Sequence, residues 1–152
     1  MTLSQLLWSH RETHDVGAVG CLRRVSNAVG VARAVMEHSR HTLLVGELAT
    51  DFALRMGFDP QTLSTPESME MHWGWKGNNC QPNFWKDVEP DSEATCGPYS
   101  PLQSEQPGAM EDIKNWAHNR YNHDTISMIA VNELGQLACA TSSNGARNKI
   151  PG

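Results

Sequence analysis

The residues best suited to chemistry in this chain are His123, Asp124 and Thr125, which directly precede the apolar run 126–131. If the Asp124–Thr125 peptide bond were cut, Thr125 would carry a free α-amine beside its own hydroxyl. An adjacent amine is one of the few bases that can activate such a weak nucleophile. The tripeptide alone is not specific, because threonine commonly opens β-strands, and by type and position an ordinary strand residue is the commoner role.

Composition limits the classes of protein to which the chain can belong. Its 152 residues predict one domain. The apolar fraction of 39% is somewhat below the usual globular range, but the charged fraction of 19% is not that of a disordered chain, so a moderate core is expected. The net charge of −5 argues against nucleic acid or an anionic membrane as a partner. No apolar run reaches the ~18 residues that a membrane span needs, and residues 1–11 do not predict a signal peptide.

The four cysteines form no CxxC pair, which argues against a structural zinc site, and neither a metal nor a cofactor is expected. Cys80 and Cys96 both lie in the most loop-like region and predict one disulfide. Cys21 and Cys139 lie in apolar surroundings and predict two buried free thiols. Four reduced, buried cysteines in a cytosolic protein remain the alternative.

The first half of the chain alternates short extended and helical patterns. Residues 15–20 predict an extended segment whose glycines allow close approach, and apolar steps over 22–39 predict an amphipathic helix. Residues 42–45 predict a short strand, and residues 47–56 a helix that ends at Gly57. Another helix is expected to begin at Thr65, with Thr65 as N-cap and Pro66 at the first helical position.

The second half contains a long irregular segment and then a hairpin. From residue 76 to 122 the periodicity is lost, so this stretch predicts a functional loop or a processed linker. Two β-like runs, 125–131 and 137–141, flank a polar connection with Gly135 and predict a β-hairpin with unpaired edges. This order predicts a layered α+β fold with three or four strands.

Several histidines, arginines and aromatic residues could either stabilise the fold or bind a ligand, and the structural role is favoured for each. His38 and His41 are expected to be surface residues and not metal ligands. Arg23 and Arg24 are expected to be solvated or in salt bridges. The aromatic cluster could be a sugar-stacking platform, although packing is the favoured role. Its members are Trp73, Trp75, Phe84 and Trp85.

Several longer motifs resemble the glycosylasparaginase family, also called aspartylglucosaminidase. They are Asp-Val-Gly-Ala-Val-Gly at 15–20, Leu-Arg-Arg at 22–24, Asn-Ala-Val-Gly-Val-Ala-Arg at 27–33, His-Thr-Leu-Leu-Val-Gly-Glu at 41–47, Asn-Cys-Gln-Pro-Asn-Phe-Trp at 79–85, Cys-Gly-Pro-Tyr at 96–99 and His-Asp-Thr-Ile at 123–126. The resemblance covers about residues 15–150, whereas residues 1–14 do not match.

The resemblance implies an N-terminal nucleophile hydrolase with an αββα sandwich, of which this chain would form part. Such a precursor cleaves itself between Asp124 and Thr125, with His123 flanking the scissile bond and Thr125 becoming the nucleophile. Ser143 falls where the family has a threonine that assists the nucleophile, and Cys80 and Cys96 match a family disulfide. Residues 15–124, including the long loop 76–122, would be α-subunit-like, and residues 125–152 would begin a β-subunit.

The implied activity is hydrolysis of the bond between an asparagine side chain and N-acetylglucosamine, without a cofactor. The family works in the lysosome and forms αβ heterodimers that pair. The family's substrate-binding arginine, its oxyanion-hole residues and an N-terminal strand with a tryptophan are expected to be missing here. A truncated, inactive form is therefore expected. The alternative is a non-catalytic fragment that misfolds or binds the full-length enzyme.

Overall fold

The computed structural model describes residues 15–102 and 125–150, and the backbone of residues 6–10. These residues divide into two compact units. Of the described residues, those up to Leu63 and those from Thr125 to Gly145 form the first unit, and those from Ser64 to Leu102 and from Ala146 to Ile150 form the second. In the described residues, no helix has the length and apolar character needed to cross a membrane.

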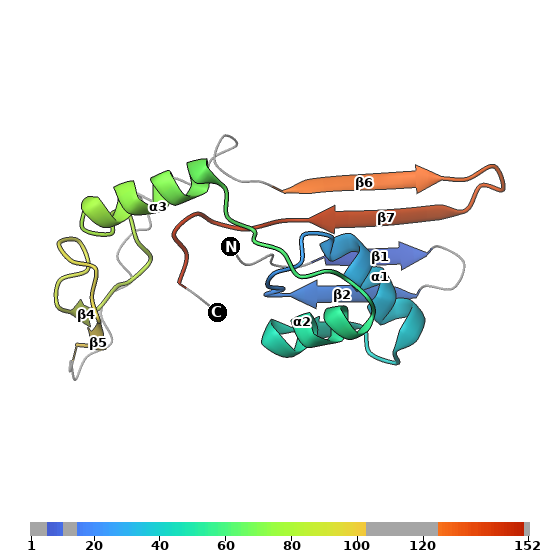
Figure 1. Ribbon diagram of the computed structural model, residues 1–152, viewed down its shortest axis with the longest axis horizontal. Coiled ribbons are helices and arrows are strands. Elements are labelled where there is room, and N and C mark those ends of the chain that lie inside the picture. Colours follow the sequence, from blue (N-terminus) through green and yellow to red (C-terminus); the bar gives the residue numbers. More distant parts are fainter. Residues whose placement is uncertain (1–5, 11–14, 103–124, 151–152) are drawn as a thin grey trace. The chain divides into compact units, whose positions relative to one another are not determined.

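The first unit is built on a five-stranded sheet with the strand order β3-β2-β1-β7-β6 (Figure 1). Its strands are β1 (Leu6–His10), β2 (Val16–Gly20), β3 (Leu43–Val45), β6 (Ile126–Val131) and β7 (Leu137–Ser142). Neighbouring strands are antiparallel except β2 and β3, which are parallel. The predicted hairpin is confirmed, and β1 joins it to the N-terminal half of the sheet.

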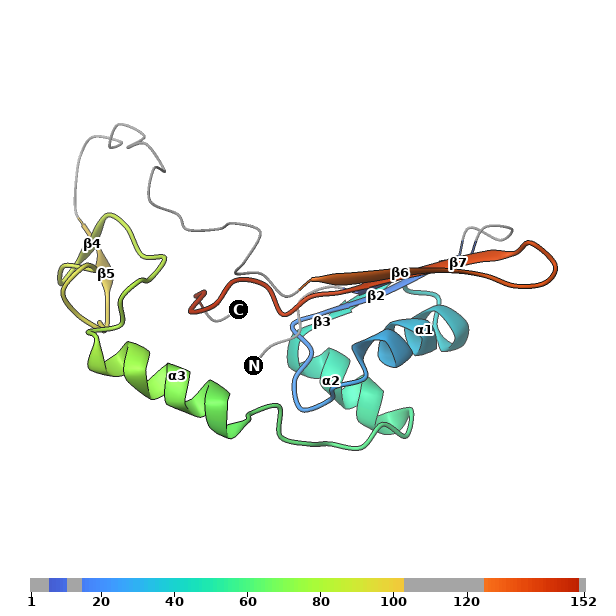
Figure 2. The ribbon, with the colours of Figure 1, turned by 90° about the horizontal axis from the view of Figure 1, so that it is seen from above.

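Helices α1 (Ala28–His38) and α2 (Gly46–Arg55) cover one face of this sheet (Figure 2). The core between the helices and the sheet is made of small and branched side chains. It contains Val19, Leu22, Val25, Ala28, Val31, Ala32, Val35, Ala49 and Ala53. Thr50 is fully buried among them, and its hydroxyl accepts a hydrogen bond from the Arg23 amide at 2.9 Å. The buried hydroxyl is therefore satisfied.

Gly17 explains how closely α1 approaches β2. A Cβ atom added there would lie 2.1 Å from the Ala32 carbonyl oxygen and 2.8 Å from the Met36 Cβ. The close approach expected for the glycines of this segment is thus confirmed, and the partner is the backbone of α1. A residue without a side chain is required at this point of the strand.

Helix α1 is shorter than the periodicity predicts, because it begins at Ala28 and not near residue 22. Cys21 and Arg24 have φ angles of 51° and 59°, a left-handed conformation that no helix can include. Asn27 then caps the helix by accepting a hydrogen bond from the Gly30 amide. Leu22 and Val25 are nevertheless buried, so their apolar spacing reflects the core and not a helix.

The other predicted elements of the first half are confirmed within a few residues. Helix α2 ends at Arg55, and Gly57 follows with a φ of 86°. Helix α3 (Pro66–Gly77) begins at Thr65, whose hydroxyl accepts from the Ser68 amide while Ser68 Oγ accepts from the Thr65 amide. This reciprocal pair is a capping box, and it extends the N-cap that the sequence predicts.

Two sequence-based expectations about the first unit are wrong. The sheet has five strands and not three or four, because Leu6–His10, in the segment without a sequence resemblance, supplies a further strand. Cys21 and Cys139 are half-buried and not buried. The α+β class is confirmed. In the described part of the first unit one sheet layer carries one helix layer, and the full αββα sandwich stays a prediction.

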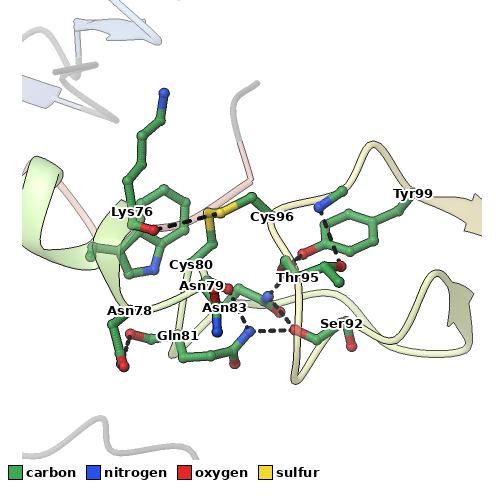
Figure 3. Close-up of a disulfide and its surroundings, with 12 residues drawn as sticks. Lys76, Asn78, Asn79, Cys80, Gln81, Asn83, Ser92, Thr95, Cys96 and Tyr99 are labelled. Carbon is green, nitrogen blue, oxygen red and sulfur yellow. Dashed lines mark hydrogen bonds between the residues drawn. A yellow bond between two sulfur atoms is a disulfide. The ribbon is translucent and has the colours of Figure 1, made fainter.

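The second unit gives order to much of the segment predicted to be a loop. Strands β4 (Val88–Glu89) and β5 (Ser100–Pro101) pair antiparallel, and Cys80 and Cys96 form the predicted disulfide with Cα atoms 5.0 Å apart. The Asn83 amide nitrogen donates to the Ser92 carbonyl oxygen at 2.6 Å and to the Tyr99 hydroxyl at 3.2 Å (Figure 3). The cross-link and these hydrogen bonds hold the described part of this unit together.

Most of the predicted aromatic cluster packs locally, as favoured from the sequence. The Trp75 indole donates to the Pro82 carbonyl oxygen at 2.8 Å, and the Trp85 ring packs at a tilt of 43° against Tyr99 with ring centroids 5.1 Å apart. Trp73 differs because it is 61% exposed, with the Lys76 ammonium 5.3 Å from its ring centroid. His38 and His41 are exposed, as expected.

Candidate active site

Strands β6 and β7 bring Thr125 and Ser143 together. Their register pairs Ile126 with Ser142, which places the preceding Thr125 across from the following Ser143. Thr125 Oγ1 donates a hydrogen bond to Ser143 Oγ over 2.9 Å. Thr125 is exposed and Ser143 is half-buried, so the nucleophile candidate is open to solvent while its neighbour is partly enclosed.

The turn between the strands fixes this register. Asn132 Oδ1 accepts hydrogen bonds from the amides of Leu134 and Gln136, at 3.0 and 2.9 Å. Gly135 adopts a φ of 76°, which a residue with a side chain rarely adopts. Because a slip of one residue would turn every side chain to the other face, this local turn determines whether Thr125 meets Ser143.

A second hydroxyl pair continues the same face of the hairpin. The Ser127 and Thr141 hydroxyl oxygens lie 3.0 Å apart and are the next such pair along the two strands. Side chains alternate between faces along a strand, so Thr125 and Ser127 share a face and Ile126 and Met128 share the other. The sheet thus has a face with two hydroxyl pairs and an opposite face that is mainly apolar.

The apolar face forms a groove of about 290 Å³ with helix α1. Val29 of α1 lines it, and the other lining residues come from β6 and β7. They are Ile126, Ser127, Met128, Ala130, Ala138, Cys139, Ala140 and Ser142. Ile126 and Met128 line this groove beside α1, and the alternation of side chains along β6 turns Thr125 away from these two side chains.

Ser143 receives a second hydrogen bond, which was not expected from the sequence. The Gly145 amide donates to Ser143 Oγ over 3.1 Å, and Gly145 has a φ of 73°. A serine followed two residues later by glycine is typical of a turn in which the hydroxyl binds the backbone, so Ser143-Asn144-Gly145 carried a readable signal. The bond fixes the Ser143 hydroxyl as an acceptor.

Two of the sequence-predicted site residues, His123 and Asp124, lie outside the described residues. Among the residues that are described, no group of three or more His, Cys, Asp or Glu side chains could hold a metal ion. The described site therefore offers hydroxyl groups and a backbone amide. Such groups can pass protons and bind a polar reactant.

Arg24 of the first unit forms an ion pair with Glu47, away from the pair of Thr125 and Ser143. Arg24 and Glu47 form a salt bridge that joins the segment before α1 to the first turn of α2. The hydrogen bond from Arg24 lowers the pKa of the Glu47 carboxyl, and the same bond raises the pKa of Arg24. The sequence expectation of a salt bridge is confirmed for Arg24, and the pair supports the fold.

The disulfide residues differ in their surroundings. Cys80 is 4% exposed and Cys96 is exposed, and Cys96 Sγ lies 3.9 Å from the Lys76 carbonyl oxygen (Figure 3). The bond closes a loop over a separation of 16 residues directly after α3. It therefore holds the first part of the irregular segment to the C-terminal end of the helix.

Comparison with known proteins now defines the class of the chain. A family model described as asparaginase matches residues 10–152. The chain therefore belongs to the asparaginase family. The match includes five residues before Asp15, the point at which the sequence resemblance begins.

Individual relatives are more specific. The chain is similar to the N(4)-(beta-N-acetylglucosaminyl)-L-asparaginases of Rattus norvegicus and Mus musculus, with 50% identity to each over 141 and 143 residues. The aligned segments cover 91% of this chain and 39% of each relative. The resemblance to glycosylasparaginase is thus confirmed, and the chain spans about two-fifths of the length of these relatives.

Proposed function

We propose that this chain belongs to an amidohydrolase that cleaves the bond between an asparagine side chain and N-acetylglucosamine. The proposal is supported by the hydrogen bond between Thr125 and Ser143, in a chain that is 50% identical to proteins named for this activity. Thr125 is the nucleophile, and Ser143 is the hydroxyl that assists it. No cofactor takes part, because the activated nucleophile is supplied by the chain itself.

The nucleophile is formed by self-cleavage at Asp124–Thr125. The Thr125 hydroxyl attacks the Asp124 carbonyl carbon, and the acyl group moves from nitrogen to oxygen. Water then hydrolyses the ester and leaves Thr125 with a free α-amine. The exposure of Thr125 supports this step, because water can reach the hydroxyl oxygen at which the ester forms.

In turnover the new amine takes the hydroxyl proton, and the oxygen attacks the side-chain carbonyl of the glycosylated asparagine. An acyl-enzyme forms and the amino sugar leaves, after which water releases aspartate. The tetrahedral states require hydrogen-bond donors around the oxyanion. By analogy with the family, the mature protein consists of an α-like and a β-like segment that pair as αβ heterodimers and act in the lysosome.

The arrangement of the sheet bears on what self-cleavage would do. Strand β1 pairs with β2 on one side and with β7 on the other, so strands from both sides of the proposed cut share one sheet. Backbone hydrogen bonds would therefore hold the two segments together after the cut. We expect the products to separate only under denaturing conditions.

The test is to express the chain and look for a piece that begins at Thr125. The piece should be seen on a denaturing gel, N-terminal sequencing should start at Thr-Ile-Ser, and native chromatography should show the two segments together. Release of aspartate from asparagine-linked N-acetylglucosamine then tests the sequence-based expectation that this chain is inactive. Cleavage at another bond, or an intact chain with no aspartate release, contradicts the proposal.

A second candidate function is non-catalytic association with another chain of the family. Strand β6 lies at an edge of the described sheet, and Ile126, Met128 and Ile129 on it are 72%, 70% and 74% exposed. An exposed apolar edge strand readily pairs with another strand. Co-purification with a full-length relative, without self-cleavage, would favour this function over the first.

A further inference from the structure

The dipeptide Asn144-Gly145, shortly after β7, places an amide side chain before a glycine nitrogen. It is the one Asn-Gly pair in the sequence. Asparagine is among the chemically labile residues of proteins, because the next backbone nitrogen can attack its side-chain carbonyl carbon and close a succinimide ring. Glycine favours this attack, since it has no Cβ to hinder the approach and a wide choice of backbone conformations. By residue type, Asn144 is therefore the asparagine most prone to this reaction.

The backbone at this dipeptide is not held by the sheet. Strand β7 ends at Ser142, and residues 143–145 have no regular secondary structure. A residue inside a strand cannot rotate toward the ring without breaking ladder hydrogen bonds, whereas a residue beyond the end of the strand can. Asn144 and Gly145 are both half-buried, so water also has access to them.

A side chain, and not a neighbouring strand, binds the Gly145 nitrogen. Its amide donates to Ser143 Oγ over 3.1 Å, and Gly145 has a φ of 73°. A bond to a hydroxyl is lost when one side chain rotates, whereas the loss of a ladder bond requires the strands to separate. The attacking nitrogen can therefore be released by a local opening while β6 and β7 stay paired.

Asn132, in the turn of the same hairpin, provides the contrast. Its Oδ1 accepts from the amides of Leu134 and Gln136, and its Nδ2 donates to Gln136 Oε1 at 2.6 Å. These bonds hold its side chain in the turn. The residue that follows is Glu133, whose Cβ hinders attack by its own nitrogen. Asn132 is therefore expected to resist the reaction.

We propose that Asn144 is a site of spontaneous deamidation in the folded chain. The Gly145 nitrogen bonds to Asn144 Cγ, the bond from Cγ to Nδ2 breaks, and ammonia leaves with the proton of the Gly145 amide. Water then opens the ring at either of its two carbonyl carbons. The products are aspartate and isoaspartate, and water is the only other reactant.

Deamidation would alter the surroundings of Ser143 without changing Thr125. Either product places a negative charge on the residue next to Ser143. Isoaspartate also adds one methylene to the backbone between Ser143 and Gly145, which displaces the Gly145 amide from Ser143 Oγ. The reaction needs only this turn and does not depend on the proposed self-cleavage.

The test incubates the native full chain in mildly alkaline buffer made with heavy-oxygen water and then digests it with trypsin in ordinary water. The tryptic peptide that ends at Arg147 contains both asparagines, so fragmentation in a mass spectrometer locates the change. We expect the labelled carboxyl at Asn144 and none at Asn132. An Asn144 that keeps its amide, or equal conversion of the two residues, overturns the proposal.

The number of products identifies the route. Ring opening at two carbons gives two peptides of equal mass that separate on chromatography, whereas direct attack of water on the side chain gives the aspartyl peptide alone. A single product would overturn the attack by Gly145.

Asn144→Gln is the matched variant, because its longer side chain requires a larger ring that forms more slowly. It should lose the product at this position, and a variant that still gains the label there contradicts the route. Self-cleavage is read separately on a denaturing gel. A chain that deamidates and stays uncut contradicts the proposed function alone, and a chain that is cut and keeps its Asn144 amide contradicts deamidation alone.

Discussion

Thr125 and Ser143 are separated by 18 residues and are joined by one hydrogen bond across the ends of a hairpin. The hydroxyl pair exists because β6 and β7 are in a register that the turn at Asn132 and Gly135 fixes. A hairpin supplies both groups without help from another element. The geometry of the candidate site is therefore as stable as the pairing of these two strands.

Removal of the Thr125 hydroxyl should abolish self-cleavage. Thr125→Ala lacks the nucleophile, so no piece beginning at residue 125 should accumulate on a denaturing gel, even after long incubation. Thr125→Ser keeps the hydroxyl and should still be cut. Cleavage of the alanine variant at the wild-type rate would show that another group attacks this bond.

A methyl group at Gly17 should destabilise the first unit strongly. In Gly17→Ala the new Cβ would lie 2.1 Å from the Ala32 carbonyl oxygen, so α1 must move away from β2. Overpacking of this kind costs about 1–3 kcal/mol, and a clash with rigid backbone belongs at the upper end. The loss should appear as a lower midpoint of urea denaturation.

Gly20 on the same strand provides the matched control. A Cβ there would meet the Val45 Cγ1 at 3.3 Å, which is the end of a side chain that can shift. Gly20→Ala should therefore cost less than about 1 kcal/mol. Equal destabilisation by the two substitutions would mean that the closeness of α1 to β2 is not the cause.

Loss of the disulfide should loosen the second unit. Closing a loop of about this length contributes about 3 kcal/mol in the chain-entropy model, and Cys80→Ser also places a hydroxyl at a position that is 4% exposed. We expect Cys80→Ser to be digested within residues 78–102 faster than the wild type. Wild-type protein treated with reductant should be digested as fast as this variant. Cys139→Ser removes a free thiol in the first unit and should leave this proteolysis unchanged.

The salt bridge of Arg24 and Glu47 should make stability depend on pH in the acidic range. The hydrogen bond from Arg24 lowers the folded-state pKa of Glu47 below its ordinary value of 4.5. A carboxyl with a lowered folded-state pKa stabilises the fold at pH values above 4.5, and this contribution is lost as the pH falls through the folded-state pKa. Glu47→Gln should therefore melt at a lower temperature than wild type near neutral pH.

The difference in melting temperature between Glu47→Gln and wild type should shrink as the pH is lowered below 4.5. It should also shrink in high salt, because both side chains are exposed and their interaction is screened. A difference that stays constant with pH would show that Glu47 acts through another property, such as its place in the first turn of α2.

Local signals in the sequence predicted much of the fold. Thr65 and Pro66 marked the start of α3, Gly57 followed the end of α2, and the Gly135 connection predicted the hairpin. These features depend on neighbouring residues, so they are readable along the chain. The start of α1 could not be predicted in this way. Leu22 and Val25 have the spacing of a helix and are buried in the same core as α1, but they lie before its first residue.

The candidate site was predictable in part for the same reason. The types of Thr125 and Ser143 and the family motifs around them singled them out, and these are properties of the sequence. Their hydrogen bond depends on strand register, and the second donor depends on the backbone conformation of Gly145. Neither can be read from residue type alone.

The sequence by itself determined the family, the chemical groups available and the two strands that carry them. The tertiary structure decided that β1 joins the sheet between β2 and β7, and that Gly17 lies against the backbone of α1. The physical reason is that residue type and local spacing encode propensity, whereas pairing and packing depend on which distant segments can bury one another's surfaces and satisfy one another's backbone hydrogen bonds.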